Sequence, residues 1–201
     1  MPQVITYTVG DGLYINMTNR CTCDCDFCLR NSINAVGDAE SLWLDYEPSR
    51  EEVRESVLSH DLTRFNEIVF CGFGEPFLRA DDLLWVARQI KQIMPGLPVR
   101  VNTNGHASMI AGYDVTPKMA GVIDRLSVSL NRADAISYTR HIRPVFGAEA
   151  FNGMLDFVEK ARCYVPEITL TVLDLLPPEE IAGCREIAER TGVSFRVRVT
   201  H

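Results

Sequence analysis

Cys21-Thr22-Cys23-Asp24-Cys25-Asp26-Phe27-Cys28 is the stretch on which the interpretation of this chain depends, because it holds four of the seven cysteines. Three of them, Cys21, Cys25 and Cys28, have the spacing C-x3-C-x2-C. One loop with this spacing can place three thiolates around an iron–sulfur cube, and cysteine thiolates are the usual protein ligands of such clusters. Three ligands to four irons leave one iron open, as a three-ligand metal site keeps a position for chemistry.

A structural zinc site is the alternative interpretation of the same loop, with Cys21, Cys23, Cys25 and Cys28 as its four ligands. Thiolate zinc sites usually pair two short knuckles that are separated by a longer spacer. Four thiols packed into one short loop fit that arrangement poorly, so the spacing favours a cluster. In the cluster interpretation Cys23 is not a ligand but a bystander thiol of the loop.

Length and composition indicate an ordinary globular protein of one core, with 201 residues of which 46% are apolar. The net charge of −7 disfavours a broad phosphate-binding surface, so duplex nucleic acid is not expected as a partner. We find neither an apolar run of membrane-spanning length nor a signal peptide at Met1-Pro2-Gln3-Val4, so we expect a cytoplasmic protein with no membrane association. Thiols stay reduced there, and the cysteine loop therefore favours a metal or redox site.

Strand and helix patterns alternate along the chain, which predicts an α/β fold with right-handed parallel crossovers. A hairpin of Gln3–Thr8 and Leu13–Met17 turns at Gly10-Asp11-Gly12, and its second strand leads into the cysteine loop. The further strands are predicted at Glu67–Cys71, Val99–Val101, Leu126–Leu130, Ile168–Leu173 and Val193–Val199, and the helices after Ser49 and at Asp81–Met94, Thr116–Ile123, Glu149–Arg162 and Glu179–Arg190. Six parallel strands with five helical segments make a partial (β/α)6 TIM-like barrel with a short N-terminal hairpin, expected to form one domain over 1–201.

Polar side chains and glycines follow three neighbouring strands, at Gly72-Phe73-Gly74-Glu75-Pro76, Asn102-Thr103-Asn104-Gly105 and Ser129-Leu130-Asn131. Because the carboxyl ends of parallel strands meet at one edge of a sheet, these groups can converge on one ligand. Glycines permit close approach of the backbone, and Glu75 can accept hydrogen bonds from an ammonium group. Plain turn chemistry is the alternative, since Asn-Gly favours turns on its own.

Taken together, these motifs resemble the radical S-adenosylmethionine (radical SAM) superfamily. The cysteine spacing with aromatic Phe27 before the last cysteine is similar to that family's cluster loop. Phe73-Gly74-Glu75-Pro76 resembles its Gly-Gly-Glu-Pro motif, with Phe73 in place of the first glycine. The turn at 102–105 resembles an Asp-Thr-Asn-Gly motif of glycyl-radical enzyme activases, with Asn102 in place of the aspartate. The small size is similar to those activases and to 7-carboxy-7-deazaguanine synthases, and the whole string looks most like the TatD-linked subgroup.

The resemblance implies a [4Fe–4S] cluster on Cys21, Cys25 and Cys28 and S-adenosylmethionine as the second cofactor. It implies cofactor-binding residues at Phe27, Gly72, Phe73, Gly74, Glu75, Asn102, Asn104, Ser129 and Asn131. The implied activity is reductive cleavage of S-adenosylmethionine to a 5′-deoxyadenosyl radical, which takes a hydrogen atom from a substrate. No catalytic side chain is assigned beyond the cluster. An external one-electron reductant of the flavodoxin or ferredoxin type is implied as a partner. A non-catalytic iron–sulfur electron-transfer protein is the alternative function.

The substrate is left open between a small molecule or nucleoside and a polypeptide. Candidate contacts are Arg140, His141 and Arg143 in the predicted loop after the fourth strand, Asp174 at the end of the fifth, and Arg196 and Arg198 on one face of the last. If that face points into the barrel, two arginines make a carboxylate or phosphate clamp; if it faces outward, they form a solvated edge.

Nothing in the sequence closes the open side of the predicted barrel. This leaves room for a large partner or for a second copy of the chain in a homodimer. Cys71, Cys163 and Cys184 are interpreted as core residues.

Overall fold

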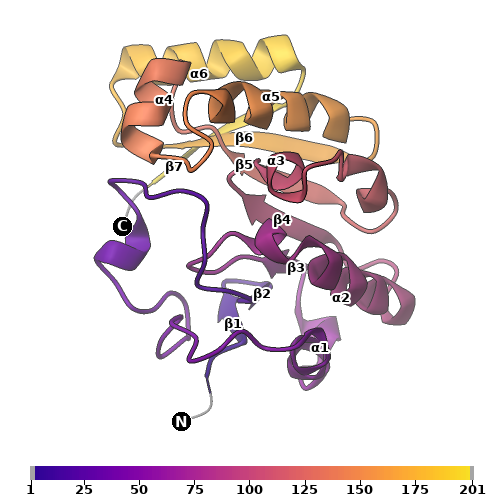
Figure 1. Ribbon diagram of the computed structural model, residues 1–201. Helices are drawn as coiled ribbons and strands as arrows, with labels where there is room; N and C mark the ends of the chain where they lie inside the picture. The colour runs from indigo at the N-terminus through magenta and orange to yellow at the C-terminus, as the bar shows by residue number, and fades with distance from the viewer. Residues whose placement is uncertain (1–2, 200–201) are drawn as a thin grey trace.

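The computed structural model describes residues 3–199 (Figure 1). Seven strands form one sheet in the order β1-β2-β3-β4-β5-β6-β7. They span Thr6–Val9, Gly12–Ile15, Glu67–Phe70, Val99–Thr103, Arg125–Ser129, Glu167–Leu173 and Ser194–Arg198. β1 pairs antiparallel with β2, and every following neighbour pair is parallel. The predicted hairpin and six parallel strands are therefore confirmed, and the fold is a partial TIM-like barrel.

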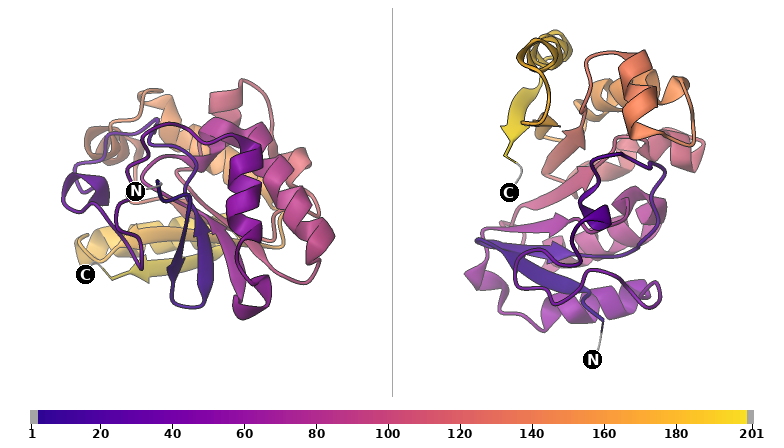
Figure 2. Two further views of the ribbon diagram at one scale, coloured as in Figure 1. Left: turned by 90° about the horizontal axis from the view of Figure 1, so that it is seen from below. Right: turned by 90° about the vertical axis from the view of Figure 1, so that its left-hand side faces the viewer.

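Helices connect the parallel strands and cover one face of the sheet. They span Arg50–Leu58 (α1), Ala80–Ile93 (α2), Ala107–Ala111 (α3), Ala135–Ile142 (α4), Glu149–Ala161 (α5) and Pro178–Thr191 (α6), with short 3-10 turns at Leu29–Asn31 (η1), Leu62–Arg64 (η2), Pro76–Arg79 (η3) and Thr116–Met119 (η4). Figure 2 shows the strong twist of the sheet, with the indigo hairpin and the yellow β7 at opposite edges. No pairing closes β1 onto β7 among the described residues, so the barrel is open on that side.

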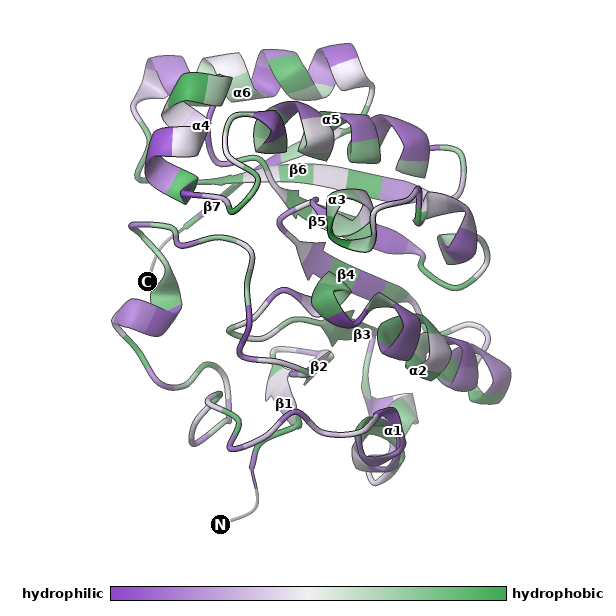
Figure 3. Cartoon of the chain, viewed as in Figure 1, coloured by the Kyte–Doolittle hydropathy of each residue, from purple (hydrophilic) through white to green (hydrophobic). Residues whose placement is uncertain are grey.

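Each strand has one apolar face and one more polar face, and this difference determines which side of the sheet the helices cover. Alternate apolar side chains pack under the helices in one large core, for example Leu13, Ile68, Val101, Val128 and Val172. Hydrophobic and hydrophilic residues alternate along α5 and α6 in Figure 3, as expected for helices with one buried side. Burying one face in this way leaves the opposite face of the sheet, here called the inner face, to carry the polar residues of the strands.

Helix termini follow the sequence signals where capping residues are present. Ser49 and Glu52 form a reciprocal capping box at the start of α1, as predicted. Pro178 opens α6, and Gly192, with a φ of 69°, ends it. These caps fix where each crossover returns to the sheet.

Two connections differ from the prediction. The predicted helix Thr116–Ile123 is only the 3-10 turn η4, and the unpredicted helix α3 precedes it. After β5 the chain forms α4 instead of a loop, because the Asp134 side chain accepts hydrogen bonds from the backbone N–H groups of Ile136 and Ser137. Arg140 and His141 therefore lie in the last turn of a helix.

The three cysteines outside the loop differ in how far they are buried. Cys184 is buried as predicted, whereas Cys163 is exposed and the prediction of a core position for it was wrong. Cys71 is only partly buried, since it follows β3 on the inner face of the sheet. The difference arises because Cys163 follows α5 on a surface turn, where nothing packs over it.

Candidate functional site

The cysteine loop lies against the segment that ends α4. The backbone N–H of Asp24 donates to the Ile142 carbonyl (3.0 Å), and that of Asp26 donates to the His141 carbonyl (3.1 Å). In return the N–H of Val145 donates to the Thr22 carbonyl at 2.9 Å. These bonds bind the loop to a rigid element, so the positions of its thiols are set by the fold.

Charged side chains reinforce the same contact. His141 Nδ1 lies 2.6 Å from Asp26 Oδ2, and Arg143 Nε lies 3.1 Å from Asp24 Oδ2. The hydrogen bond from His141 lowers the pKa of Asp26. His141 and Arg143, two of the candidates for substrate contact, thus contact the cysteine loop, and His141 also lines a cavity beside it.

The four thiols of the loop have unequal environments. Cys21, Cys25 and Cys28 are partly exposed, while Cys23 is buried with 7% of its surface exposed. A hydrogen bond from the Cys23 thiol lowers the pKa of Cys21 to about 6 and also lowers that of Cys25, whereas burial raises the pKa of Cys28. Thiolates, not thiols, bind metal, so the buried thiol favours the ligand form of two of its neighbours.

A single ion and a cluster make different demands on these thiols. Within residues 3–199, no three or more His, Cys, Asp or Glu side chains are grouped so as to hold one metal ion. A cube binds its thiolates at separate corners, so its ligands need not converge on one point. Three partly exposed thiols on one clamped loop fit this second requirement.

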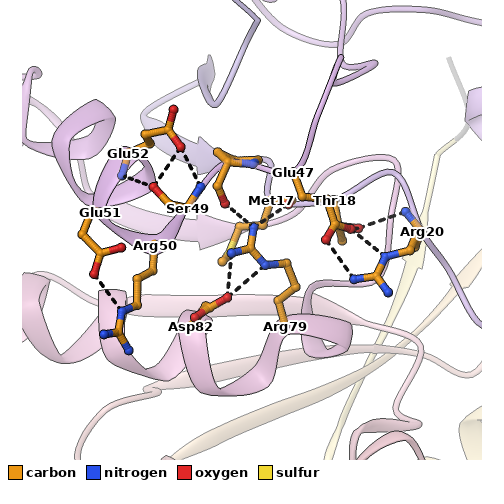
Figure 4. Close-up of polar contacts among 11 residues, drawn as sticks. Met17, Thr18, Arg20, Glu47, Ser49, Arg50, Glu51, Glu52, Arg79 and Asp82 are labelled. Carbon is orange, nitrogen blue, oxygen red and sulfur yellow. Dashed lines mark hydrogen bonds and ion pairs between the residues drawn. The ribbon is translucent and has the colours of Figure 1, made fainter.

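The chain that enters the loop is fixed by two arginines (Figure 4). Arg79 donates to the Met17 carbonyl at 3.1 Å and pairs with Asp82 at 2.6 Å. Arg20, directly before the first cysteine, pairs with Glu47 at 2.6 Å, and Glu47 also accepts a hydrogen bond from Thr18. The long connection between β2 and α1 is thereby pinned on both sides of the loop.

The glycine turn after β3 packs against this entry segment. A Cβ atom on Gly72 would lie 2.1 Å from Asn16 Oδ1, and one on Gly74 would lie 2.3 Å from the Thr18 carbonyl oxygen. The N–H of Glu75 donates to the Arg20 carbonyl at 2.8 Å. The glycines are therefore required here because the turn passes the chain of the cysteine loop closely.

The side chains of this turn point away from each other. Phe73 packs against Trp43, with ring centroids 5.0 Å apart, in a small apolar cluster with Leu42. Glu75 is 3% exposed and accepts hydrogen bonds from the Asn104 N–H at 2.7 Å and the Thr103 hydroxyl at 2.8 Å. Burial raises the pKa of Glu75 to about 7. Its carboxylate joins the ends of β3 and β4 beneath the cysteine loop.

Asn104 and His106 contact the loop from below, and Tyr138 contacts His106 in turn; the sequence analysis singled out neither His106 nor Tyr138. Asn104 Nδ2 donates to Thr22 Oγ1 at 2.9 Å and to Cys23 Sγ at 3.4 Å. His106 is fully buried, with Nδ1 3.7 Å from Cys23 Sγ and Nε2 3.0 Å from the Tyr138 hydroxyl. Burial lowers the pKa of His106 to about 4 and keeps the ring neutral. Its position directly after the Asn-Gly turn was the only available sequence signal.

Phe27 and Asn131 line one cavity of about 230 Å³ between the cysteine loop and the ends of β5 and β6. Asn131 has a φ of 56°, a conformation that non-glycine residues rarely adopt, and its buried Oδ1 has no hydrogen-bond partner in the part of the chain described. Such a strained residue with an orphaned acceptor is typical of a ligand site. Ser129 ends β5 next to it, partly exposed.

Asn102 is not part of this cavity. Its Oδ1 accepts a hydrogen bond from Arg100 at 3.1 Å on the inner face of the sheet. Arg196 and Arg198 share that face, because Phe195 and Val197 pack on the helix side. Of the two alternatives for these arginines, the structure supports the one in which they point into the barrel. Arg196 donates to Ser127 Oγ at 3.3 Å on that face.

An open parallel barrel with a three-thiol loop at the carboxyl ends of its strands defines a class of cluster-dependent enzymes. The sequence profile of the Radical SAM superfamily matches residues 15–191, and the chain belongs to this superfamily. Its cofactors are a [4Fe–4S] cluster and S-adenosylmethionine, and family members generally need an external reductant. Comparison with curated proteins gives no significant match.

Three solved structures have similar folds at low sequence identity. A radical SAM methyltransferase from Sphaerobacter thermophilus aligns with a TM-score of 0.59 and 13% identity, covering 98% of this chain and 69% of its own. Methylornithine synthase aligns with a TM-score of 0.64 and 15% identity, covering 94% of this chain and 52% of its own. SuiB from Streptococcus suis, bound to S-adenosylmethionine, aligns with a TM-score of 0.66 and 11% identity, covering 94% of this chain and 38% of its own. The chain thus spans between about two fifths and two thirds of these proteins' lengths.

The helices leave no candidate for a membrane span. Across residues 3–199, none combines the length and the apolar character that crossing a bilayer needs.

Proposed function

We propose that this chain reductively cleaves S-adenosylmethionine and uses the resulting radical to take hydrogen from a small molecule, nucleoside or polypeptide. Cys21, Cys25 and Cys28 would hold the cluster by three of its irons. The observation that carries the proposal is the clamped three-thiol loop beside the cavity with the orphaned Asn131 Oδ1. When bound, the reduced cluster supplies the electron that breaks the sulfonium bond of the second cofactor.

The residues of the chain divide the remaining tasks. The hydrogen bonds of Cys23 to Cys21 and Cys25, together with burial, raise the pKa of Cys23, so this thiol stays protonated and donates to its neighbours. Asn104 and His106 hold the loop from below, and Glu75 fixes the strand ends that carry them.

We assign the cavity lined by Phe27 and Asn131 to part of S-adenosylmethionine. Asn131 Oδ1 can accept a hydrogen bond that no described protein group provides, and Phe27 offers a ring face next to it. Ser129 is the third polar group at this edge. The backbone of Gly72–Glu75 and the inner-face Asn102 stay in the proposal as contacts for the cofactor's polar groups.

We propose that a flavodoxin or ferredoxin type of protein delivers the electron. The loop lies at the surface, where Leu29, next to Cys28, is 51% exposed and offers an apolar contact beside the cluster site. The open side of the barrel is proposed to receive the substrate, with a second copy of the chain as one way to cover it. On the sequence motifs alone, we place the chain in the TatD-linked subgroup and treat 1–201 as one core domain.

Anaerobic reconstitution with iron and sulfide, followed by dithionite and S-adenosylmethionine, tests this proposal. We expect 5′-deoxyadenosine and methionine in equal amounts. A reconstituted protein with cluster absorbance but no 5′-deoxyadenosine would instead support the electron-transfer alternative. Protein that binds one zinc ion tightly and no cluster would contradict both.

A further inference from the structure

The inner face of the sheet is rich in arginine although the whole chain has a net charge of −7. Its charged residues come from five strands, and the arginines outnumber the acids by four to two: Arg100, Arg125, Arg196 and Arg198 against Glu67 and Glu167. A local excess of one sign on a concave surface attracts ligands of the opposite sign.

Two of these arginines are already neutralised by the two acids. Arg100 binds both carboxylate oxygens of Glu67, at 2.7 and 3.1 Å. Arg125 lies 2.9 Å from Glu167 and 3.4 Å from Glu67. Both acids are therefore engaged near the amino ends of the strands.

The other two arginines have no acidic partner within residues 3–199. The one hydrogen bond of the Arg196 side chain within that range goes to the neutral Ser127 hydroxyl, at 3.3 Å. The Nε of Arg198 is buried without a hydrogen-bond acceptor in that range. Burial lowers the pKa of Arg198, the charges of Arg196 and Arg100 lower it further, and the neighbouring Cys71 and Tyr14 oppose this shift. A guanidinium in such surroundings destabilises the fold unless an anion joins it.

The same face contains a space for a ligand. A cavity of about 480 Å³ is lined by Arg196, Ser127 and Thr169, by the paired Arg100 and Arg125, and by the acids Asp11, Glu67 and Glu167. Arg198, two residues further along β7, is not among its lining residues. This volume lies within the range of small-molecule sites. The lining acids Glu67 and Glu167 pair with Arg100 and Arg125, so the donors left for an oxyanion are the Arg196 guanidinium and the hydroxyls of Ser127 and Thr169.

We propose that the inner face binds a carboxylate or phosphate group of the substrate through Arg196 and Arg198. The inference rests on the proposed function and names the substrate class: an organic anion that enters from the open barrel. Planar guanidinium groups bind such oxyanions with paired hydrogen bonds. The two arginines are spaced two residues apart on β7, so both project from the same face.

Anion binding by the cluster-reconstituted protein tests this site. Inorganic phosphate and succinate are titrated separately at constant ionic strength against potassium chloride, and the thermal midpoint Tm is measured. We expect at least one of the two anions to raise the Tm of the unmodified protein. The apparent Kd for that anion should increase at least tenfold in Arg198→Met and stay within twofold in Arg185→Met. Arg185 is the matched control because its guanidinium stacks on Phe195, on the other face of β7, at 4.9 Å.

The Tm measured without phosphate or succinate is an independent test of the site. In chloride alone, Arg198→Met should have a Tm equal to or above that of the unmodified protein, because the change removes a cation without a described counter-charge. Should Arg198→Met fail to fold, Arg198→Lys must still weaken the anion effect, since lysine lacks the planar fork. A response to phosphate would indicate a phosphorylated substrate, and a response to succinate a carboxylic acid.

Three results would overturn the inference. One is the absence of any shift with either anion, and another is an equal shift in Arg198→Met and the unmodified protein. The third is loss of S-adenosylmethionine binding in Arg198→Met, because Arg198 would then serve the cofactor. The failure of the proposed function is seen separately, as the absence of 5′-deoxyadenosine in the unmodified protein.

Discussion

Gly74→Ala is expected to loosen the cysteine loop without touching a thiol. Its added methyl group would lie 2.3 Å from the Thr18 carbonyl oxygen and 2.5 Å from that of Arg20. Both are backbone atoms, so relief requires the turn and the entry segment to separate. That movement also breaks the 2.8 Å hydrogen bond from the Glu75 N–H to Arg20.

The magnitude follows from these two effects. Overpacking at a tight contact costs about 1–3 kcal/mol, and a lost internal hydrogen bond costs about 1 kcal/mol. A total of about 2–4 kcal/mol corresponds to a Tm lower by roughly 5–15 °C in a protein of this size. Because the loop moves, iron uptake on reconstitution should fall as well.

The assay is thermal unfolding of the metal-free protein, followed by iron and sulfide determination after reconstitution. Gly96→Ala is the matched control, since no atom lies within 4 Å of the added Cβ there. Its Tm should be unchanged or slightly higher. The reasoning is refuted if Gly74→Ala unfolds within 1 °C of Gly96→Ala and takes up the same amount of iron.

Three further predictions concern single side chains of the site. Cys28→Ala should lose nearly all cluster absorbance while Cys23→Ala keeps it; a Cys23→Ala protein without cluster would show that Cys23 is a ligand. His106 should destabilise the fold as pH falls from 6.5 towards 4, because its depressed pKa means that the unfolded chain binds the proton first. The free energy of unfolding should lose up to about 3 kcal/mol more in the unmodified protein than in His106→Gln, and parallel pH profiles by denaturant titration would contradict this. Asn131→Gly, which tolerates the positive φ, should weaken S-adenosylmethionine binding about tenfold with little change in Tm; an unchanged Kd would remove Asn131 from the cofactor site.

Sequence patterns predicted the strands better than the crossovers. The alternation of apolar residues identified the hairpin and all six parallel strands, because burial of one face against the helices leaves a strong local signal. The connection after β5 was misjudged since α4 depends on one capping residue, Asp134, in a polar stretch. The 3-10 turn η4 replaced a predicted helix for a related reason, as Gly121, with a φ of 67°, breaks the pattern.

The site could be predicted only where the spacing of residues in the sequence indicates a ligand set. The spacing of three cysteines within one loop indicates directly that they can share a ligand site. The contact of His141 with Asp26, by contrast, joins residues 115 apart in the chain. His106 beneath Cys23 is equally nonlocal and has no motif. For Arg196, the pattern gave the two faces of β7 but not which one the helices cover, because that depends on the packing of Phe195 under α6.

The state of the iron in anaerobically reconstituted protein is the most direct test of the central claim, that three thiolates leave one iron of the cube free for S-adenosylmethionine. Mössbauer spectra should show about four irons per chain as a cube, with one iron in four changing its signal when S-adenosylmethionine is added. A spectrum in which all four irons are equivalent and unaffected by S-adenosylmethionine would contradict the account.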